Sequence, residues 1–217
     1  MRKLIFISIF FLTNNVLCQS NIFSTNLTVN YAVEYIDSNV IVHDTLAIFV
    51  TGRQWQTDAN QKEIIISYAV DQIDTSVFSD LFSIGWISAD TTGAVDNEKF
   101  CWFHPPRHNQ YSILELAPFP RVEYPLTTGK KYARLLSIGE GWGEMSNSKI
   151  TWSYNVVEHV GNNWKITSIA IPDKEPEKIN RLDFVFNEIN GFLELNYLFD
   201  NGIKINMKRI IRTANSK

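Results

Sequence analysis

The string His104-Pro105-Pro106-Arg107-His108 has the most unusual chemistry in the sequence. Two imidazoles four residues apart would bind a metal ion from one face of a helix, but two consecutive prolines exclude that helix. An extended proline-rich segment does not bring the imidazoles together, so we predict no metal site. Two interpretations stay open: a structural corner, or a ligand contact through His104 and Arg107, which proline rigidity would present at little entropic cost.

The string Gly139-Glu140-Gly141-Trp142-Gly143 has the glycine content of a phosphate-binding loop. No Lys-Ser/Thr pair follows it, and the next residues predict a strand where that loop requires a helix. We therefore expect a wide turn or bulge with the indole packed across it. A sugar-stacking role for Trp142 is the alternative interpretation.

The sequence contains none of the common catalytic motifs. There is no Gly-x-Ser-x-Gly elbow and no His-Glu-x-x-His pair, and the carboxylates are scattered over predicted loops. We therefore predict no catalytic residues, no cofactor and no metal. A secreted hydrolase with its site near residues 104–125 stays open as the alternative.

Composition excludes several classes of protein. The 217 residues include 20 Lys and Arg against 23 Asp and Glu, so we expect no nucleic-acid partner, which would need a clustered basic excess. Two cysteines exclude a disulfide scaffold, and Cys101, between two aromatic residues, is predicted to be a buried apolar residue. Aromatic residues make up 13% of the chain, which predicts a folded core.

Residues 1–18 are predicted to be a signal peptide. Arg2 and Lys3 precede an apolar run at residues 4–12, which is too short for the roughly 20 residues of a membrane-spanning helix. Cys18 is either a lipidated cysteine or is removed with the leader, and Leu17 disfavours lipidation because that peptidase prefers a small residue there. We expect an exported chain in the periplasm, at the outer membrane or outside the cell, without a transmembrane span.

The remaining residues, 19–217, are predicted to form a single β-rich domain. The clearest strands are in the second half, where Asn-Gly pairs punctuate alternating apolar and polar residues. These strands are expected at 131–138, 149–159, 163–171, 180–189, 191–199 and 203–211.

The first half is expected to contain strands at 27–36, 40–50 and 63–70 and a short helix at 74–82. Two further strands, 82–88 and 99–104, should flank a polar loop at 89–98. Residues 105–125 hold five of the seven prolines, which predicts an irregular, extended crossover within the domain.

These elements predict a mainly β protein with at most one or two short helices. Its antiparallel meander must curl, close or pack against a second sheet to hide its edges, so a half-barrel, a barrel and a sandwich stay open. Aromatic residues of the later strands either fill the core or line a cavity for a hydrophobic ligand. Among them, Trp152 and Trp164 are candidate ligand contacts, together with the residues of the two strings above.

Three segments carry a resemblance to a known family: residues 103–107, 117–120 and 125–132, followed by a meander that ends in Gly191-Phe192-Leu193. Over roughly residues 83 to 210 the chain resembles uncharacterised exported proteins and lipoproteins of the Bacteroidota. The Pro-Leu-x-x-Gly-Lys segment is also similar to periplasmic curved-sheet proteins of the lipoprotein-carrier type. That resemblance implies a half-barrel that holds a lipid, and it brings no catalytic or binding residues with it.

The function expected from the sequence is non-catalytic. We predict an exported binding or envelope-assembly module whose partner is a hydrophobic small molecule or an envelope protein. A purely structural or protein-interaction domain without a pocket is the other alternative to the hydrolase.

Overall fold

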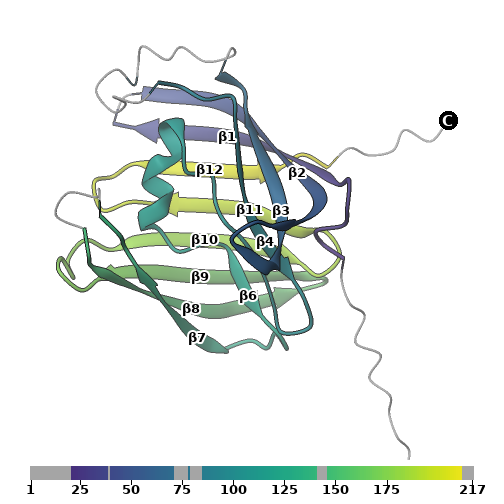
Figure 1. Ribbon diagram of the computed structural model, residues 1–217. Coiled ribbons are helices and arrows are strands. Elements are labelled where there is room, and N and C mark those ends of the chain that lie inside the picture. Colours follow the sequence, from purple (N-terminus) through teal and green to yellow (C-terminus); the bar gives the residue numbers. More distant parts are fainter. Residues whose placement is uncertain (1–20, 39, 71–77, 79–84, 141–145, 212–217) are drawn as a thin grey trace, which may run out of the picture.

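The computed structural model describes residues 21–38, 40–70, 78, 85–140 and 146–211. These described residues form one antiparallel sheet and a short 3₁₀ helix, η3 (Figure 1). The elements are β1 (Thr28–Asp37), β2 (Val40–Trp55), β3 (Asp58–Tyr68), β4 (Ala89–Asp96), β5 (Phe100–Phe103), η3 (Asn109–Leu116), β6 (Arg121–Glu123), β7 (Lys131–Ser137), β8 (Lys149–Val160), β9 (Asn163–Pro172), β10 (Asn180–Asn187), β11 (Gly191–Leu198) and β12 (Lys204–Arg209).

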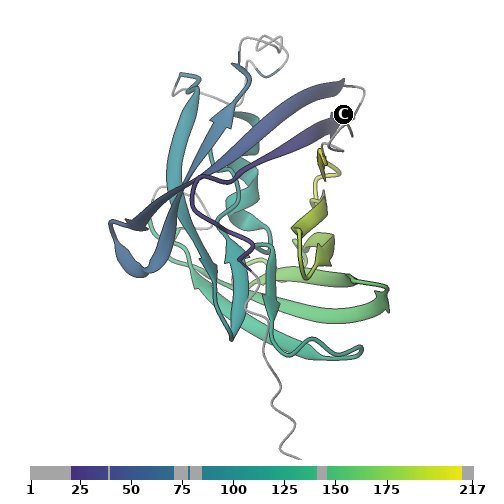
Figure 2. The same cartoon turned by 90° about the vertical axis from the view of Figure 1, so that its right-hand side faces the viewer.

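The strands lie in the order β6-β5-β4-β3-β2-β1-β12-β11-β10-β9-β8-β7. Each half of the chain is a simple meander, and the pairing of β1 with β12 joins the two meanders into one sheet. The two ends of the sheet are β6 and β7, which are consecutive along the chain. The sheet curls strongly (Figure 2), and the predicted mainly β, barrel-like antiparallel fold is confirmed as a nearly closed 12-stranded barrel.

The core lies inside the curl and is rich in aromatic side chains. Seven aromatic residues of the later strands are buried there: Trp152, Tyr154, Trp164, Phe184, Phe186, Tyr197 and Phe199. Buried hydroxyl groups bind the backbone across the barrel. Tyr31 Oη donates to the carbonyl of Phe192 at 2.8 Å, and Tyr154 Oη donates to the carbonyl of Phe119 at 2.9 Å. These bonds satisfy polar groups that burial would otherwise penalise.

The later strands agree closely with the prediction, because each of the six begins and ends within two residues of its expected bounds. The prediction of a polar loop at 89–98 is wrong. Most of this segment is β4, and the turn is confined to the residues between β4 and β5. Thr92 and Ala94 face the core, so threonine and alanine serve as inward residues there. Gly93 permits the close approach of β3, because a Cβ at this position would lie 1.8 Å from Gln61 Oε1.

Residues 105–125 are not extended throughout, which corrects the prediction. They contain η3, whose Tyr111 and Leu114, with Ala117 just beyond it, are fully buried at a spacing of three, the period of a 3₁₀ helix. Tyr111 Oη and Gln110 Nε2 donate to Asp44 Oδ2 at 2.6 Å and 2.8 Å, which fixes the helix to β2. The helix predicted at 74–82 lies outside the described residues except for position 78.

Candidate ligand-binding site

The two ends of the sheet meet through side chains at a seam formed by Arg121, Glu123, Tyr132 and Arg134. Among the described residues, no β ladder joins β6 to β7. Tyr132 Oη donates to the carbonyl of Arg121 at 2.6 Å, and burial raises the pKa of Tyr132 far above its usual value, so it stays a neutral donor. The guanidinium groups of Arg121 and Arg134 both bind Glu123 Oε1, the former at 3.1 Å.

Strand alternation explains why these side chains converge. In β5 and β6 the residues Cys101 and Val122 face the core and are fully buried. Their neighbours Trp102 and Arg121 are paired across the ladder and point to the other face. On the opposing end of the sheet, Trp152 lies directly opposite Arg134 across β8 and β7.

A pocket of about 230 Å³ lies beside the seam. It is lined by Trp102, Phe119, Arg121, Arg134, Leu135, Leu136 and Trp152. The Phe119 ring centroid lies 4.4 Å from that of Trp152 and 6.4 Å from that of Trp102, so three aromatic rings form a continuous apolar wall. We call this site the seam pocket.

Trp152 has an unsatisfied polar group beside this pocket. Its side chain is 7% exposed, and its indole N–H has no hydrogen-bond partner among the described residues. A buried N–H without a partner costs roughly 1–3 kcal/mol, so such groups are uncommon in folded proteins. Trp152 therefore combines a lining position in the seam pocket with a buried donor that has no partner in the described part of the chain.

The seam has a local excess of positive charge. Arg121 and Arg134 share the single carboxylate of Glu123, and Lys130 Nζ donates to the carbonyls of Glu123 and Pro125 at 2.7 Å and 2.9 Å. The whole chain has a formal charge of −3, so this excess is a property of the seam. Apolar walls beside two guanidinium groups suit a ligand that is apolar in one part and anionic in another.

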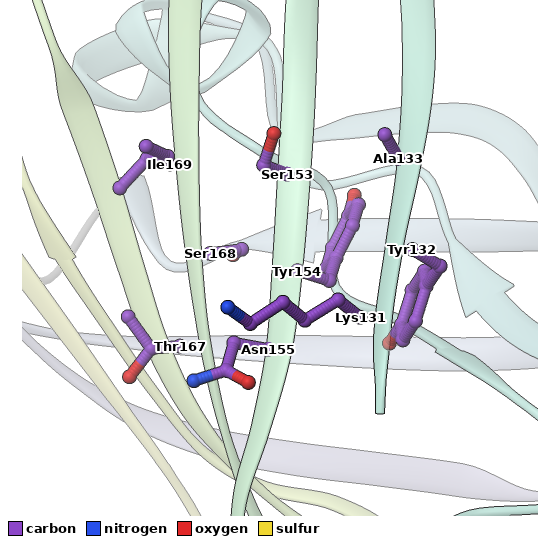
Figure 3. A pocket seen from close by; sticks show the side chains of 9 residues that line it. All are labelled: Lys131, Tyr132, Ala133, Ser153, Tyr154, Asn155, Thr167, Ser168 and Ile169. Atoms are coloured by element: carbon purple, nitrogen blue, oxygen red, sulfur yellow. The ribbon is translucent and has the colours of Figure 1, made fainter. Parts of the chain in front are cut away.

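A second hollow, of about 520 Å³, lies over the neighbouring strands β7, β8 and β9 (Figure 3). It is lined by Lys131, Tyr132, Ala133, Ser153, Tyr154, Asn155, Thr167, Ser168 and Ile169. Figure 3 shows Lys131 extending across β8 above Asn155. The lining combines small and uncharged polar residues with Ile169, the stacked rings of Tyr132 and Tyr154, 4.7 Å apart between centroids, and a single lysine. It therefore has one cation where the seam pocket has two.

Residues 104–108, which we call the proline corner, contact β4 and η3. Arg107 Nε donates to Asp90 Oδ2 at 2.9 Å, and His108 Nε2 lies 3.4 Å from the same oxygen. His104 Nδ1 lies 2.9 Å from the carbonyl of Pro105, and its Nε2 lies 3.5 Å from Glu115 Oε1.

Burial shifts both members of the His104–Glu115 pair toward their neutral forms. It lowers the pKa of His104 to about 4 and raises the pKa of Glu115 to about 7. A neutral carboxylic acid beside a neutral imidazole can exchange a proton with it. The His104 ring, however, packs on Phe119, with 4.5 Å between ring centroids, and neither residue lines the seam pocket.

The structure places the remaining predicted site residues apart. Trp164 lies at the other end of the β8–β9 ladder from Trp152, stacks on His159 at 3.7 Å between centroids, and donates its N–H to Glu188 at 2.8 Å. Trp142 and Cys18 lie outside the described residues. Of the four predicted ligand contacts that the structure describes, only Trp152 therefore lines the seam pocket.

Trp102, Phe119, Arg121 and Arg134 line the seam pocket but are not among the site residues predicted from the sequence. The available signal was weak: Arg121 and Arg134 each occupy a strand position among apolar neighbours, where a charge needs a partner. Within the described residues, no group of three or more His, Cys, Asp or Glu side chains could hold a metal ion, and no helix is long and apolar enough to cross a membrane.

The class that this geometry defines is a nearly closed antiparallel β-barrel with a side-chain seam. A scan against protein-family models gives no match, and a search of curated proteins gives no significant match. A search of solved structures finds a predicted exported protein from Bacteroides fragilis with a YmcC-like fold. The two chains are 7% identical with a TM-score of 0.42, and the match covers 86% of this chain and 94% of the other.

Proposed function

We propose that this chain is a non-catalytic binding module whose ligand occupies the seam pocket. The observation that supports the proposal is the pocket itself, where three aromatic rings and two arginines surround about 230 Å³. An apolar group would occupy the space between the rings, and an anionic group would bind the guanidinium groups. No covalent change of the ligand is required.

In this proposal the proline corner has a structural role and does not contact the ligand. The Arg107 guanidinium and the His108 ring both lie against Asp90, and His104 contacts Phe119 and Glu115. These contacts use the groups that a ligand or a hydrolytic reaction would need. We infer that His104 and Arg107 hold the corner against β4 and position Phe119 in the pocket wall.

Binding of 8-anilino-1-naphthalenesulfonate tests the proposal, because this probe joins an apolar aromatic body to an anion. We expect saturable binding by the folded protein, with fluorescence enhancement, and an affinity loss of about tenfold or more in Arg134→Gln, because a charge-assisted hydrogen bond is removed.

Arg181→Gln is the matched control variant. Arg181 is an ion-paired arginine on β10 whose side chain is 49% exposed, against 47% for Arg134, and it lies outside the seam pocket. Equal affinities of the two variants for the probe, or no saturable binding by the wild-type protein, would contradict the proposal. Urea denaturation of each variant verifies that the variant is folded, so that the fluorescence of the probe reports binding to native protein.

A further inference from the structure

The strand β7 has an open backbone edge next to the seam pocket. It is one end of the sheet, and β6, the other end, is only three residues long (Figure 1). The contacts of Tyr132 and Arg134 with β6 cover the first part of β7. The remaining part, Leu135–Leu136–Ser137, continues past the last seam contact.

The hydrogen-bond pattern shows which backbone groups face this edge. Ile138 N–H donates to the carbonyl of Ser148, and Val156 N–H donates to the carbonyl of Lys130, both at 2.9 Å. The register between β7 and β8 is constant from end to end. Antiparallel ladders alternate, so even-numbered residues of β7 bind β8, and the N–H and carbonyl groups of Leu135 and Ser137 point away from the sheet.

Within the part of the chain that the structure describes, this edge lacks the protection that sheet edges usually have. Native edges are blocked by lysines, prolines, bulges or a covering segment. Residues 135–137 are Leu-Leu-Ser, with no charge and no proline, and Leu135 is 61% exposed. Among the described residues, no backbone hydrogen bond to the outward groups of these residues is present.

The size of the pocket limits what it can hold. Pockets for drug-sized ligands have volumes of roughly 300–1,000 Å³. The seam pocket, at about 230 Å³, is smaller and is lined by Leu135 and Leu136 of the edge strand itself. It therefore suits one compact apolar group, which is either the ring of the naphthalenesulfonate probe or one large side chain of a chain that lies along β7.

We propose that the ligand of the seam pocket is an extended peptide segment of a partner protein that pairs with the free edge of β7. This inference rests on the proposed function and names its ligand. The peptide adds a strand beside Leu135–Ser137, inserts one aromatic or large aliphatic side chain between Trp102 and Trp152, and places an acidic side chain at Arg134. Charge complementarity favours an acidic segment, because two arginines at the seam share one carboxylate.

A capped heptapeptide, acetyl-Thr-Val-Glu-Phe-Thr-Val-Thr-amide, tests the proposal by isothermal titration calorimetry on the full-length protein. Ser137→Pro removes an outward N–H of β7, leaves the bonds to β8 in place, and changes no residue of the pocket lining. We expect this variant to bind the peptide about tenfold more weakly than the wild type, and to bind the naphthalenesulfonate probe unchanged.

A second comparison does not depend on how the variant folds. The same peptide with N-methyl groups on those alternate residues whose N–H groups face β7 keeps its side chains but cannot donate hydrogen bonds to that edge, whereas methylation of the other alternate residues leaves the pairing edge intact. We expect the peptide methylated on the edge that faces β7 to bind the wild-type protein at least about tenfold more weakly than the unmodified peptide. Equal affinities of these two peptides would overturn strand addition.

The outcomes separate this inference from the proposed function. If the probe binds in an Arg134-dependent manner and the peptide does not bind at millimolar concentration, the pocket is a site for a small amphiphile and the peptide inference is wrong. If neither binds, both proposals are wrong. Retained peptide binding in a folded Ser137→Pro variant also contradicts the inference.

Discussion

Trp152 combines a packed ring with an indole N–H that has no partner among the described residues, and this contrast separates it from Trp164. The indole of Trp164 has both a stacking partner and an acceptor, so its polar group is satisfied without a ligand. The two residues are indistinguishable in the sequence, because both occupy inward positions of neighbouring strands. Only the folded environment assigns a packing role to one and a candidate binding role to the other.

A prediction about a single residue follows from the environment of Glu115. Burial raises its pKa to about 7, so the folded state binds a proton more tightly than the unfolded state between about pH 4.5 and 7. Its contribution to stability is present below pH 4.5 and is lost as the pH rises through 7. The lowered pKa of His104 acts in the opposite direction, because the unfolded state binds more protons between about pH 4 and 6.5.

Glu115→Gln isolates the carboxyl group, since His104 is present in both proteins. We expect the variant to match the wild type at pH 4.5 and to exceed its unfolding free energy at pH 8 by on the order of 2 kcal/mol. Urea denaturation at the two pH values measures this difference. A variant that is less stable than the wild type at pH 8 would mean that the ionised carboxylate stabilises the fold.

The turns show what sequence patterns predict at the scale of elements. Gly191 and Gly202 follow asparagines, and both have positive φ angles, +75° and +88°, which is why Asn-Gly pairs located the hairpins of the second half so well. In the first half the signals were weaker. β4 uses threonine and alanine as inward residues, and η3 has a period of three inside a proline-rich segment, so neither matched the usual templates.

Substitution of these two glycines separates backbone strain from side-chain collision. Gly202→Ala adds a Cβ in open space, so we expect a loss of about 1 kcal/mol from the left-handed conformation alone. Gly191→Ala places a Cβ 2.5 Å from Ile22 Cγ2, and we expect at least about 1 kcal/mol more, since Ile22 must move. Equal losses in chemical denaturation would mean that the segment around Ile22 adapts freely.

At the scale of the whole molecule, closure of the sheet creates the candidate site. Arg121 and Arg134 come from opposite ends of a 12-stranded sheet and share Glu123 only because the sheet curls until its ends meet. Periodicity predicted the strands and the antiparallel pairing, but it left a half-barrel, a barrel and a sandwich open. A site that depends on which ends meet is therefore outside the reach of strand patterns, although Trp152 was identified as a candidate.

The most direct measurement is a two-dimensional ¹H–¹⁵N spectrum of the six tryptophan indoles during titration with 8-anilino-1-naphthalenesulfonate. Substitutions Trp102→Phe, Trp152→Phe and Trp164→Phe assign the three signals that matter. Binding in the seam pocket predicts that the Trp102 and Trp152 signals shift and saturate together while the Trp164 signal stays in place. Unchanged Trp102 and Trp152 signals at saturating probe would contradict the existence of a ligand site at the seam.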